Sequence, residues 1–310
     1  MIRVGTRRSL LARTQSGHVA ELIRSVTGDT VELVEITTDG DRSQASQTPL
    51  SDPAATSTGV FVSALREALL DQSVDVAVHS LKDLPTAPAA GITLAAIPPR
   101  EDPRDAVVAR DGLTLGELPV GSRVGTGSPR RAAQLEALGL GLDIVGVRGN
   151  VDTRIAKVRS GDLDAVILAR AGLARIGRLD EISEVLDPLQ MLPAPGQGAL
   201  AVECRADDPL AAVLAGIDDS ATRAATAAER AVLATLEGGC SAAIGALAEV
   251  VDGDEGTELW VRAIALSPDG AGSVRMSASG GPDDATGLGA RLATQMLADG
   301  AGELTLMEGA

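Results

Sequence analysis

The chain has 310 residues and a formal net charge of −16, because 43 Asp and Glu outweigh 27 Lys and Arg. The phosphate backbone of nucleic acids repels so acidic a chain, which excludes general nucleic-acid binding. The 45% hydrophobic and 23% charged contents are those of a globular protein and exclude long-range disorder. No segment approaches the roughly 20 apolar residues of a membrane span, and the amino terminus lacks the apolar core of a signal peptide.

The first hundred residues alternate strand-like and helix-like segments. Residues 2–6 and 31–37 are typical of strands, and Ser9 is a candidate cap for the helical pattern that follows the first of them. A second helical pattern covers residues 60–70, and a short apolar run at 74–78 predicts another strand. This alternating order predicts a mostly parallel sheet covered by helices.

Two proline-rich stretches divide the rest of the α/β region. The first, at residues 98–104, marks a crossing into a second α/β series, and the second, at residues 193–198, precedes a strand-like segment at 199–204. Two crossings predict two α/β lobes, with the chain returning to the first. In the second series we expect strands near residues 105–109, 123–125, 143–147 and 165–169, and helices that start at Ser128 and Asn150.

The last ninety residues have a different pattern. An Ala-rich helix at 220–236 ends at a Gly pair, and a final helix covers 284–298. Between them, three strand-like segments separated by Gly and Asp turns predict an antiparallel sheet, so this part is a small α+β domain. The three segments are residues 244–251, 258–266 and 273–279.

Four arginines follow strand ends in the second series. Arg130 and Arg131 come after the segment 125–129 at a predicted helix start, where free N–H groups and the helix dipole favour an anion. Arg148 ends a strand, and Arg154 lies on the first turns of the next helix. Open α/β sheets place ligands at such junctions. The spacing alone leaves two interpretations open, a ligand site and solvated helix starts.

The charge of the chain is unevenly distributed. Residues 120–180 hold 10 basic and 6 acidic side chains, whereas residues 200–310 hold 6 basic and 18 acidic ones. A basic middle in an acidic protein indicates a small anionic ligand held in a focused cleft. In the first lobe, Arg7 and Ser9 form a third strand-to-helix junction, which either adds to that cleft or is a polar turn with a helix cap.

A titratable cluster follows the strand at 74–78, with His79, Lys82 and Asp83 in one short turn. A carboxylate beside cations is ionised, so Asp83 could stabilise a developing positive charge or move a proton. The alternative is a structural or solvated turn, with His79 a satisfied buried side chain.

Phe61 and Cys240 are single residues in suggestive surroundings. Phe61 is the one phenylalanine in a chain without tyrosine, which indicates either a stacking role or a core position at a helix start. Cys240 follows Gly238 and Gly239, which leave its sulfur accessible, so it is either a covalent attachment point or a packed thiol. Cys204 fits a strand core, and two cysteines are too few for a disulfide scaffold, which favours a reducing cytoplasm.

Together these segments resemble one family along nearly the whole chain, hydroxymethylbilane synthase, also called porphobilinogen deaminase. The resemblance implies an α/β plus α+β fold: two lobes like periplasmic binding proteins around a cleft, and a smaller C-terminal domain with a three-stranded antiparallel sheet. The matching motifs are residues 76–85, 100–106, 125–131, 148–154, 192–199 and 236–240. The implied domains are residues 1–98 with 199–217, residues 104–193, and residues 220–310.

The resemblance also implies an activity: four porphobilinogens are joined head to tail with release of ammonia, and the linear tetrapyrrole is then hydrolysed from a dipyrromethane primer. The primer is one covalent cofactor per chain, joined by a thioether to Cys240, and no metal takes part. We expect a cytoplasmic monomer. The implied catalytic acid is Asp83. The implied cofactor-binding residues are Cys240, Lys82, Asp83, Ser128, Arg130, Arg131 and Arg148. The implied substrate-binding residues are Arg7, Ser9, Phe61, Arg148, Arg154 and Arg175.

One departure from the family and one alternative function remain at this stage. Many members carry lysines in the loop before Gly59, whereas residues 54–58 here contain none. The alternative is a two-lobed binding or sensor protein that holds a small carboxylated ligand without catalysis. Such a protein has the same lobes and arginines, but it needs neither Asp83 nor a third domain with Cys240.

Overall fold

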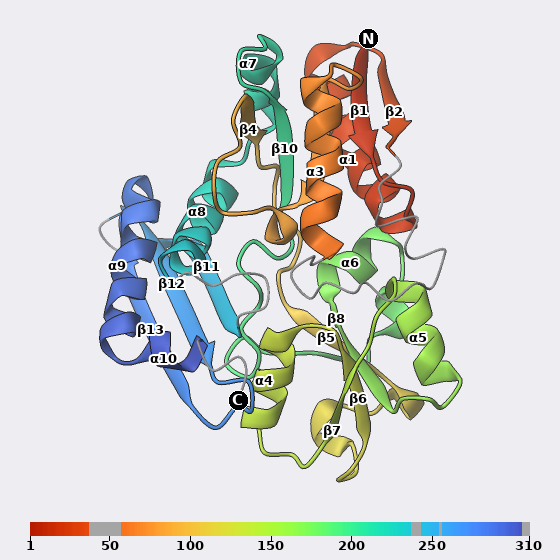
Figure 1. Cartoon of the computed structure of the whole chain (residues 1–310), viewed down its shortest axis with the longest axis vertical. Helices are drawn as coiled ribbons and strands as arrows, with labels where there is room; N and C mark the ends of the chain where they lie inside the picture. Colours follow the sequence, from red (N-terminus) through yellow and green to blue (C-terminus); the bar gives the residue numbers. More distant parts are fainter. Residues whose placement is uncertain (37–56, 237–242, 254–255, 306–310) are drawn as a thin grey trace. The chain divides into compact units, whose positions relative to one another are not determined.

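A computed structural model of the chain describes residues 1–36, 57–236, 243–253 and 256–305. The chain divides into two compact units (Figure 1). The first comprises Met1–Arg100 and Ala199–Arg223, and the second comprises Glu101–Gly198 and Ala224–Ala310. Among the described residues, no helix is long and apolar enough to cross a membrane.

The first unit is built on a five-stranded sheet with the strand order β2-β1-β3-β10-β4. Strand β1 pairs in parallel with β2 and β3, whereas β10 runs antiparallel to both of its neighbours. Because β10 runs against β3, it begins at the edge of the sheet where β1 and β3 end. The strands are β1 (Ile2–Thr6), β2 (Val31–Glu35), β3 (Val76–Ser80), β4 (Ile92–Ala96) and β10 (Leu200–Arg205).

Helix α1 (Leu10–Thr27) shows how local sequence fixes an element of this unit. Ser9 begins it, since its Oγ accepts the Ala12 N–H at 3.3 Å, and Gly28 ends it in the left-handed conformation, with φ 71°. Its apolar face is buried with strand residues in the core of the sheet. The other helices of the unit are α3 (Ser57–Leu70), α7 (Leu210–Leu214), the beginning of α8 (Ser220–Thr235), and the short 3₁₀ turns η1 (Leu81–Asp83) and η5 (Ala215–Ile217).

The second unit contains a five-stranded sheet with the order β7-β6-β8-β5-β9. Strand β6 is parallel to β7 and β8, and β5 is antiparallel to β8 and β9, so this sheet repeats the first one strand for strand. In both sheets the antiparallel strand, β5 or β10, is the first strand after a chain crossing. The strands are β5 (Asp105–Ala109), β6 (Arg123–Thr126), β7 (Asp143–Gly146), β8 (Ala165–Ala169) and β9 (Glu184–Val185).

The second unit also contains a three-stranded antiparallel sheet in the order β11-β12-β13. Alternate side chains of β11 and β12 pack with helices α8 and α9 in one apolar core. The elements here are β11 (Ile244–Gly253), β12 (Gly256–Leu266), β13 (Ser273–Gly280), α9 (Ala285–Ala298) and α10 (Ala301–Thr305). Helices α4 (Pro129–Ala137), α5 (Val151–Arg159) and α6 (Arg170–Arg175), with the 3₁₀ turns η2 (Arg110–Gly112), η3 (Leu115–Glu117) and η4 (Leu179–Glu181), accompany the five-stranded sheet.

The predicted fold class is confirmed: two α/β sheets and a three-stranded antiparallel sheet are present. The three predicted domain ranges stay a prediction. In the structure the second range and residues 224–310 of the third lie within one compact unit. Their sheets are joined by the Ala246 N–H, which donates to the Pro193 carbonyl at 3.0 Å, and by a buried apolar cluster. The members of this cluster are Ala133, Leu192, Ala243, Leu247, Ile264 and Leu266.

Candidate functional site

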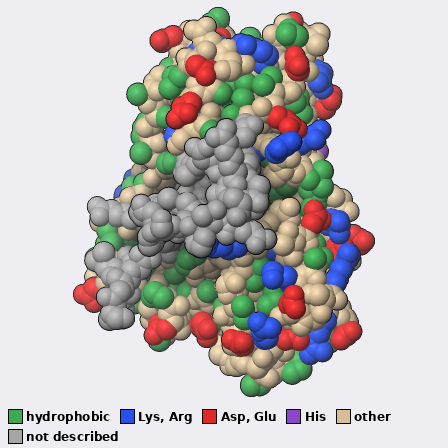
Figure 2. Space-filling model, turned by 45° about the vertical axis from the view of Figure 1, so that its right-hand side comes forward, with side chains coloured by type: hydrophobic (Ala, Val, Ile, Leu, Met, Phe, Trp, Pro, Cys, Tyr) green, Lys and Arg blue, Asp and Glu red, His purple; other side chains and the backbone are tan. Residues whose placement is uncertain are grey.

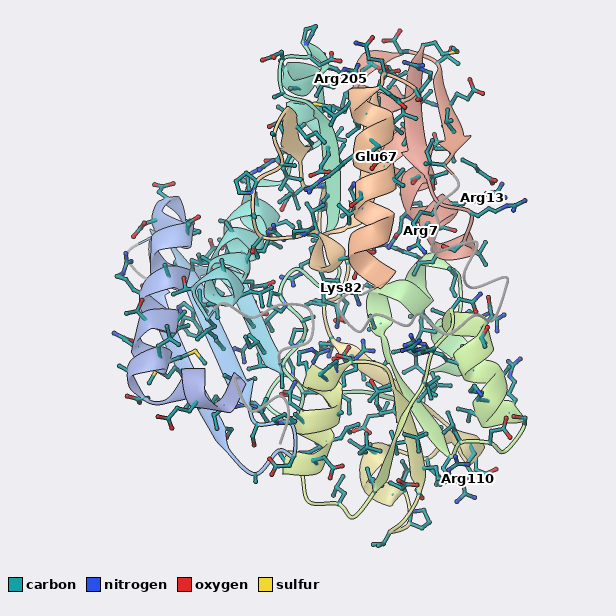
Figure 3. The ribbon with its side chains drawn as sticks, in the orientation of Figure 1. Arg7, Arg13, Glu67, Lys82, Arg110 and Arg205 are labelled. Atoms are coloured by element: carbon teal, nitrogen blue, oxygen red, sulfur yellow. The ribbon has the colours of Figure 1, made fainter. Side chains whose placement is uncertain are left out.

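In the first unit, predicted site residues lie where β1 and β3 end. These strands pair in parallel, with Gly5 opposite Ala77, so Arg7 and the turn after Ser80 follow the same edge of the sheet. Figure 3 labels Arg7 and Lys82 near this end of the unit. Ser9 is the cap of α1, and both Arg7 and Ser9 are half-buried. Phe61 lies in helix α3.

The Lys82–Asp83 turn is held by the two leucines that flank it. Leu81 and Leu84 are 0% and 5% exposed and belong to one apolar cluster. The Leu81 N–H donates to the Ala199 carbonyl at 3.0 Å, at the start of β10. Lys82 and Asp83, between these anchors, stay half-buried. The turn therefore presents an ammonium and a carboxylate from a fixed backbone.

Behind this turn, His79 is part of a buried charge cluster with Arg66 and Glu203. The Glu203 carboxylate accepts Arg66 Nη2 at 2.7 Å and Nε at 3.0 Å, and His79 Nε2 lies 3.2 Å from its Oε2. Burial raises the pKa of Glu203, but the polar contacts with His79 and Arg66 outweigh it and lower that pKa to about 2. His79 is thus buried beside a carboxylate, and its role stays a prediction.

In the second unit, Arg130 and Arg131 bind one buried carboxylate, that of Asp105. Asp105 is 0% exposed and begins β5, which runs against β8, so it lies at the edge where β6 ends and α4 starts. Arg130 Nη2 donates to its Oδ2 at 2.7 Å, and Arg131 donates to its Oδ1 from Nη2 at 2.7 Å and from Nε at 3.1 Å. We call Asp105, Arg130, Arg131 and Gln197 the Asp105 cluster.

Gln197 completes the cluster without adding charge. Its Nε2 donates to Asp105 Oδ1 at 2.8 Å and to the Pro103 carbonyl at 2.6 Å. Burial by itself raises the pKa of Asp105, but the charges of Arg130 and Arg131 hold that pKa far below its usual range. One carboxylate therefore faces two guanidiniums, and the cluster carries one excess positive charge.

Arg130 keeps one donor unused. Its side chain is 4% exposed, and its Nε has no hydrogen-bond partner among the residues that the structure describes. A buried unpaired N–H is costly, so a ligand oxygen that accepts from it is favoured. An excess positive charge and an open donor fit a group that bears carboxylates.

The other predicted residues of this unit lie at neighbouring strand ends. Ser128 is the residue before α4, and Arg148 is exposed in the loop before α5. Arg154 donates from Nε to the Gly149 carbonyl at 2.9 Å, and burial together with the charge of Arg131 lowers the pKa of Arg154. Arg131 and Arg154 are thus near enough to repel each other, which again favours an anion.

Gly127 leaves room for Arg154 and for the Val147 carbonyl beside the start of α4. A Cβ on Gly127 would overlap the Val147 carbonyl oxygen and would come within 3.7 Å of Arg154 Nη2. Arg175 lies elsewhere in the unit, where its Nη2 donates to the Gly198 carbonyl at 2.6 Å, and burial lowers its pKa. The structure therefore brings Arg130, Arg131 and Arg154 together, whereas Arg175 binds the crossing segment.

Other cations of the second unit also have carboxylate partners. Arg178 contacts Asp152 at 2.8 Å and Glu181 at 2.9 Å, and Arg110 contacts Asp164 at 2.7 Å. Figure 2 shows basic and acidic side chains interspersed over the face that it draws. The unneutralised positive charge of residues 120–180 thus lies in the buried Asp105 cluster more than on the surface.

Comparison with protein families identifies the family to which the chain belongs. Residues 2–212 match the family model of the porphobilinogen deaminase, dipyromethane cofactor binding domain, and residues 224–298 match that of the porphobilinogen deaminase C-terminal domain. The chain belongs to the porphobilinogen deaminase family. The resemblance seen in the sequence is thereby confirmed, and the alternative of a binding protein without catalysis gains no support.

Full-length relatives agree with this family. The chain is 59% identical over 310 residues to porphobilinogen deaminase of Mycobacterium tuberculosis (strain H37Rv), which covers 98% of each chain. It is 58% identical over 315 residues to that of Mycobacterium marinum, which covers 100% of this chain and 98% of the other.

Solved structures with similar folds are more distant. The methionine-binding protein MetQ is 13% identical, with a TM-score of 0.42 over 69% of this chain and 88% of its own. The aliphatic sulphonate binding protein SsuA from Escherichia coli is 16% identical, with a TM-score of 0.39 over 76% of this chain and 70% of its own.

In the second unit, one further buried carboxylate connects the helix before Cys240 to the Asp105 cluster. Glu229 of α8 is 0% exposed and accepts the Gly196 N–H at 2.6 Å and the Ala248 N–H at 2.8 Å. Gly196 precedes Gln197 of the cluster. Cys240 itself lies outside the described residues.

Sequence reasoning assigned no role to Asp105, Gln197 or Glu229. Asp105 and Gln197 stand in motifs that carried the family resemblance, but nothing in their spacing showed that they meet. They are 92 residues apart in the chain, and the antiparallel entry of β5 brings them together. The motifs were the one available signal.

Proposed function

We propose that this chain is a hydroxymethylbilane synthase, which joins four porphobilinogens head to tail with release of ammonia and hydrolyses the linear tetrapyrrole from its primer. Family membership supports the reaction, and the Asp105 cluster supports the substrate class. Each porphobilinogen carries two carboxylates, so the growing chain accumulates negative charge. A buried cluster with one excess positive charge and an open donor suits such a ligand.

The cofactor in this proposal is a dipyrromethane joined by a thioether to Cys240, and when bound it supplies the pyrrole carbon to which the first substrate is joined. Arg130 and Arg131 hold one of its carboxylates, since their guanidiniums are already oriented by Asp105. The remaining residues that hold it are Lys82, Asp83, Ser128 and Arg148.

The substrate residues are a second set. Arg154, close enough to Arg131 for the two charges to interact, extends the cationic site beyond the cofactor. Arg7 and Ser9 take up substrate at the strand ends of the first unit, and Phe61 covers the pyrrole rings. Arg148 and Arg175 complete this set.

Asp83 is the catalytic carboxylate of the proposal. When the carbon–nitrogen bond of a substrate breaks and ammonia leaves, positive charge develops on the pyrrole, and the nearby carboxylate stabilises it. When the carbon–carbon bond forms, a proton leaves the pyrrole carbon, and the same carboxylate accepts it. The turn between Leu81 and Leu84 fixes Asp83 for both steps.

The chain acts as a monomer in the cytoplasm in this proposal. All proposed site residues belong to one chain, so no second copy is needed. Cys204 is 0% exposed, and burial raises the pKa of its thiol to about 11, so it stays a thiol and takes no part in the chemistry.

The test is turnover of porphobilinogen, followed by release of ammonia and by the absorbance of the porphyrin that the product gives on oxidation. The wild type releases four ammonia molecules for each tetrapyrrole. Asp83→Asn lowers the rate by roughly 10²- to 10⁴-fold, the usual contribution of a general acid–base group. Asp111→Asn, on an exposed turn of the second unit, is the control and keeps the wild-type rate. A wild type that binds porphobilinogen without releasing ammonia contradicts the proposed function.

A further inference from the structure

The carboxylate of Asp105 is the least expected member of the cationic site. Its side chain is 0% exposed, and all its hydrogen-bond partners among the described residues are donors: two guanidiniums and the amide of Gln197. A negative charge in a site for carboxylates weakens the binding of the ligand. Its presence therefore needs a physical reason.

Stability is a weak reason. Desolvating a buried ion cluster costs about as much as the attraction returns, so such clusters contribute little net stability. The fold itself does not call for a charge at this place. In the first unit the corresponding strand β10 carries Leu200 opposite the end of β3, where β5 carries Asp105 opposite the end of β8. The same topology is thus built with a leucine.

Orientation is a stronger reason. Arg131 donates twice to Oδ1 of Asp105 and once to the Ile167 carbonyl at 2.9 Å, which fixes the plane of its guanidinium. Arg130 donates to Oδ2 and to the Leu192 carbonyl, and its Nε remains open. Side chains that are already oriented lose little entropy when they bind a ligand.

Charge is the second reason. Two adjacent guanidiniums without a counter-ion carry two positive charges in a buried site, which is costly. With Asp105 the excess is one, and one ligand carboxylate neutralises it.

We propose that Asp105 is a positioning residue of the cofactor site: it fixes Arg130 and Arg131 in one orientation and sets their joint excess charge at one, so that a single carboxylate of the cofactor completes the cluster. This inference rests on the proposed function and extends it to a residue that touches neither cofactor nor substrate. Asp105 acts through the two arginines.

The experiment compares Asp105→Asn with a matched control, Asp75→Asn. Asp75 also binds two arginines, since it accepts Arg3 Nη2 at 2.8 Å and Arg205 Nη2 at 3.4 Å, but it lies at the amino end of β3 in the first unit. Each variant is purified from cells that make porphobilinogen. The fraction of chains that carry the mass of a dipyrrole is measured by intact mass spectrometry, and folding is followed by circular dichroism.

The wild type and Asp75→Asn carry the cofactor to the same extent. Asp105→Asn is folded but carries it about tenfold less or lower still, the scale of one or two lost charge-assisted hydrogen bonds. Asp105→Glu, which keeps the charge but moves the carboxylate by one methylene, recovers part of the loading. If Asp105→Asn does not fold, Asp105→Glu tests the proposal instead. A folded Glu variant with less cofactor than the wild type supports the proposal, and a Glu variant loaded like the wild type overturns it.

Two further results overturn the proposal. One is Asp105→Asn loaded like the wild type. The other is Asp75→Asn with an equal loss of loading, because the effect is then general destabilisation. A wild type without dipyrrole mass and without turnover removes the proposed function and this inference together, whereas a loaded wild type beside a loaded Asp105→Asn removes this inference alone.

Discussion

The two units each hold an aspartate between two arginines, and the two clusters differ in burial and in charge. Asp75 of the first unit is 19% exposed, and its partner Arg205 also contacts Asp208. Two arginines there face two carboxylates. Asp105 of the second unit is fully buried, and two arginines face it alone among the described residues.

The edges of the sheets explain this difference. Asp75 precedes β3, at the amino ends of the parallel strands, where Arg3 and Arg205 bind β1, β3 and β10 to one another. Asp105 begins an antiparallel strand, so it lies at the carboxyl ends of β6 and β8, where α/β sheets place ligands. The balanced cluster at one edge holds strands of a sheet together, whereas the unbalanced one at the other edge is the proposed cofactor site.

The largest effect on stability is expected for Arg131→Gln. This change removes two of the donors that hold the buried Asp105 carboxylate, at a cost of about 3–4 kcal/mol in the free energy of unfolding. Urea denaturation at neutral pH measures it. Arg205→Gln, from the half-buried Asp75 cluster, is the control. If Arg131→Gln costs less than this control, the proposed difference between the two edges is wrong.

An intermediate effect is expected from the buried Glu203 when the pH falls. Its pKa of about 2 in the folded chain is below the ordinary 4.5, so its stabilising contribution is present above pH 4.5 and is lost as the pH falls toward 2. The full loss is about 3 kcal/mol by linkage, and part of it occurs between pH 5 and 3.

Urea denaturation of the wild type and of Glu203→Gln at these two pH values isolates this contribution. The variant is less stable at pH 5 and has a shallower pH dependence than the wild type, because it lacks the titrating group. Equal slopes for the two proteins contradict the assigned cause of the shift.

The smallest effect is expected for Arg3→Gln. The side chain of Arg3 is 35% exposed, and water replaces its hydrogen bonds to Asp75, while Arg205 remains. The midpoint of urea denaturation stays close to the wild-type value, and cofactor loading is unchanged. If this variant carries less cofactor than the wild type, the amino edge of the first sheet also contributes to cofactor binding, and the proposed difference between the two edges is wrong.

Much of the fold could be predicted from the sequence because most strands are short apolar runs between turn signals. β5, β6, β7 and β8 lie where the pattern placed them, within a residue. β4 and β9 were not predicted, because they are edge strands with partly exposed side chains and so lack a clear apolar period.

The candidate site was predicted less completely. Arg130 and Arg131 stand out in the sequence because they follow a glycine-rich strand end. Their shared partner Asp105 lies 25 residues earlier than Arg130, and the antiparallel strand β5 brings it there. Such a contact depends on the order of the strands in the sheet, which the local sequence pattern does not predict. The roles assigned to individual site residues stay predictions.

The central claim is that this chain builds tetrapyrroles on a dipyrromethane joined to Cys240, and intact mass spectrometry tests it most directly. Wild-type protein and Cys240→Ser are purified from cells that make porphobilinogen. The wild type is expected to carry the added mass of one dipyrrole on the peptide that contains Cys240, and the variant is expected to be folded without it. A wild type of unmodified mass that nevertheless converts porphobilinogen to product, or added mass that persists in Cys240→Ser, would contradict the account.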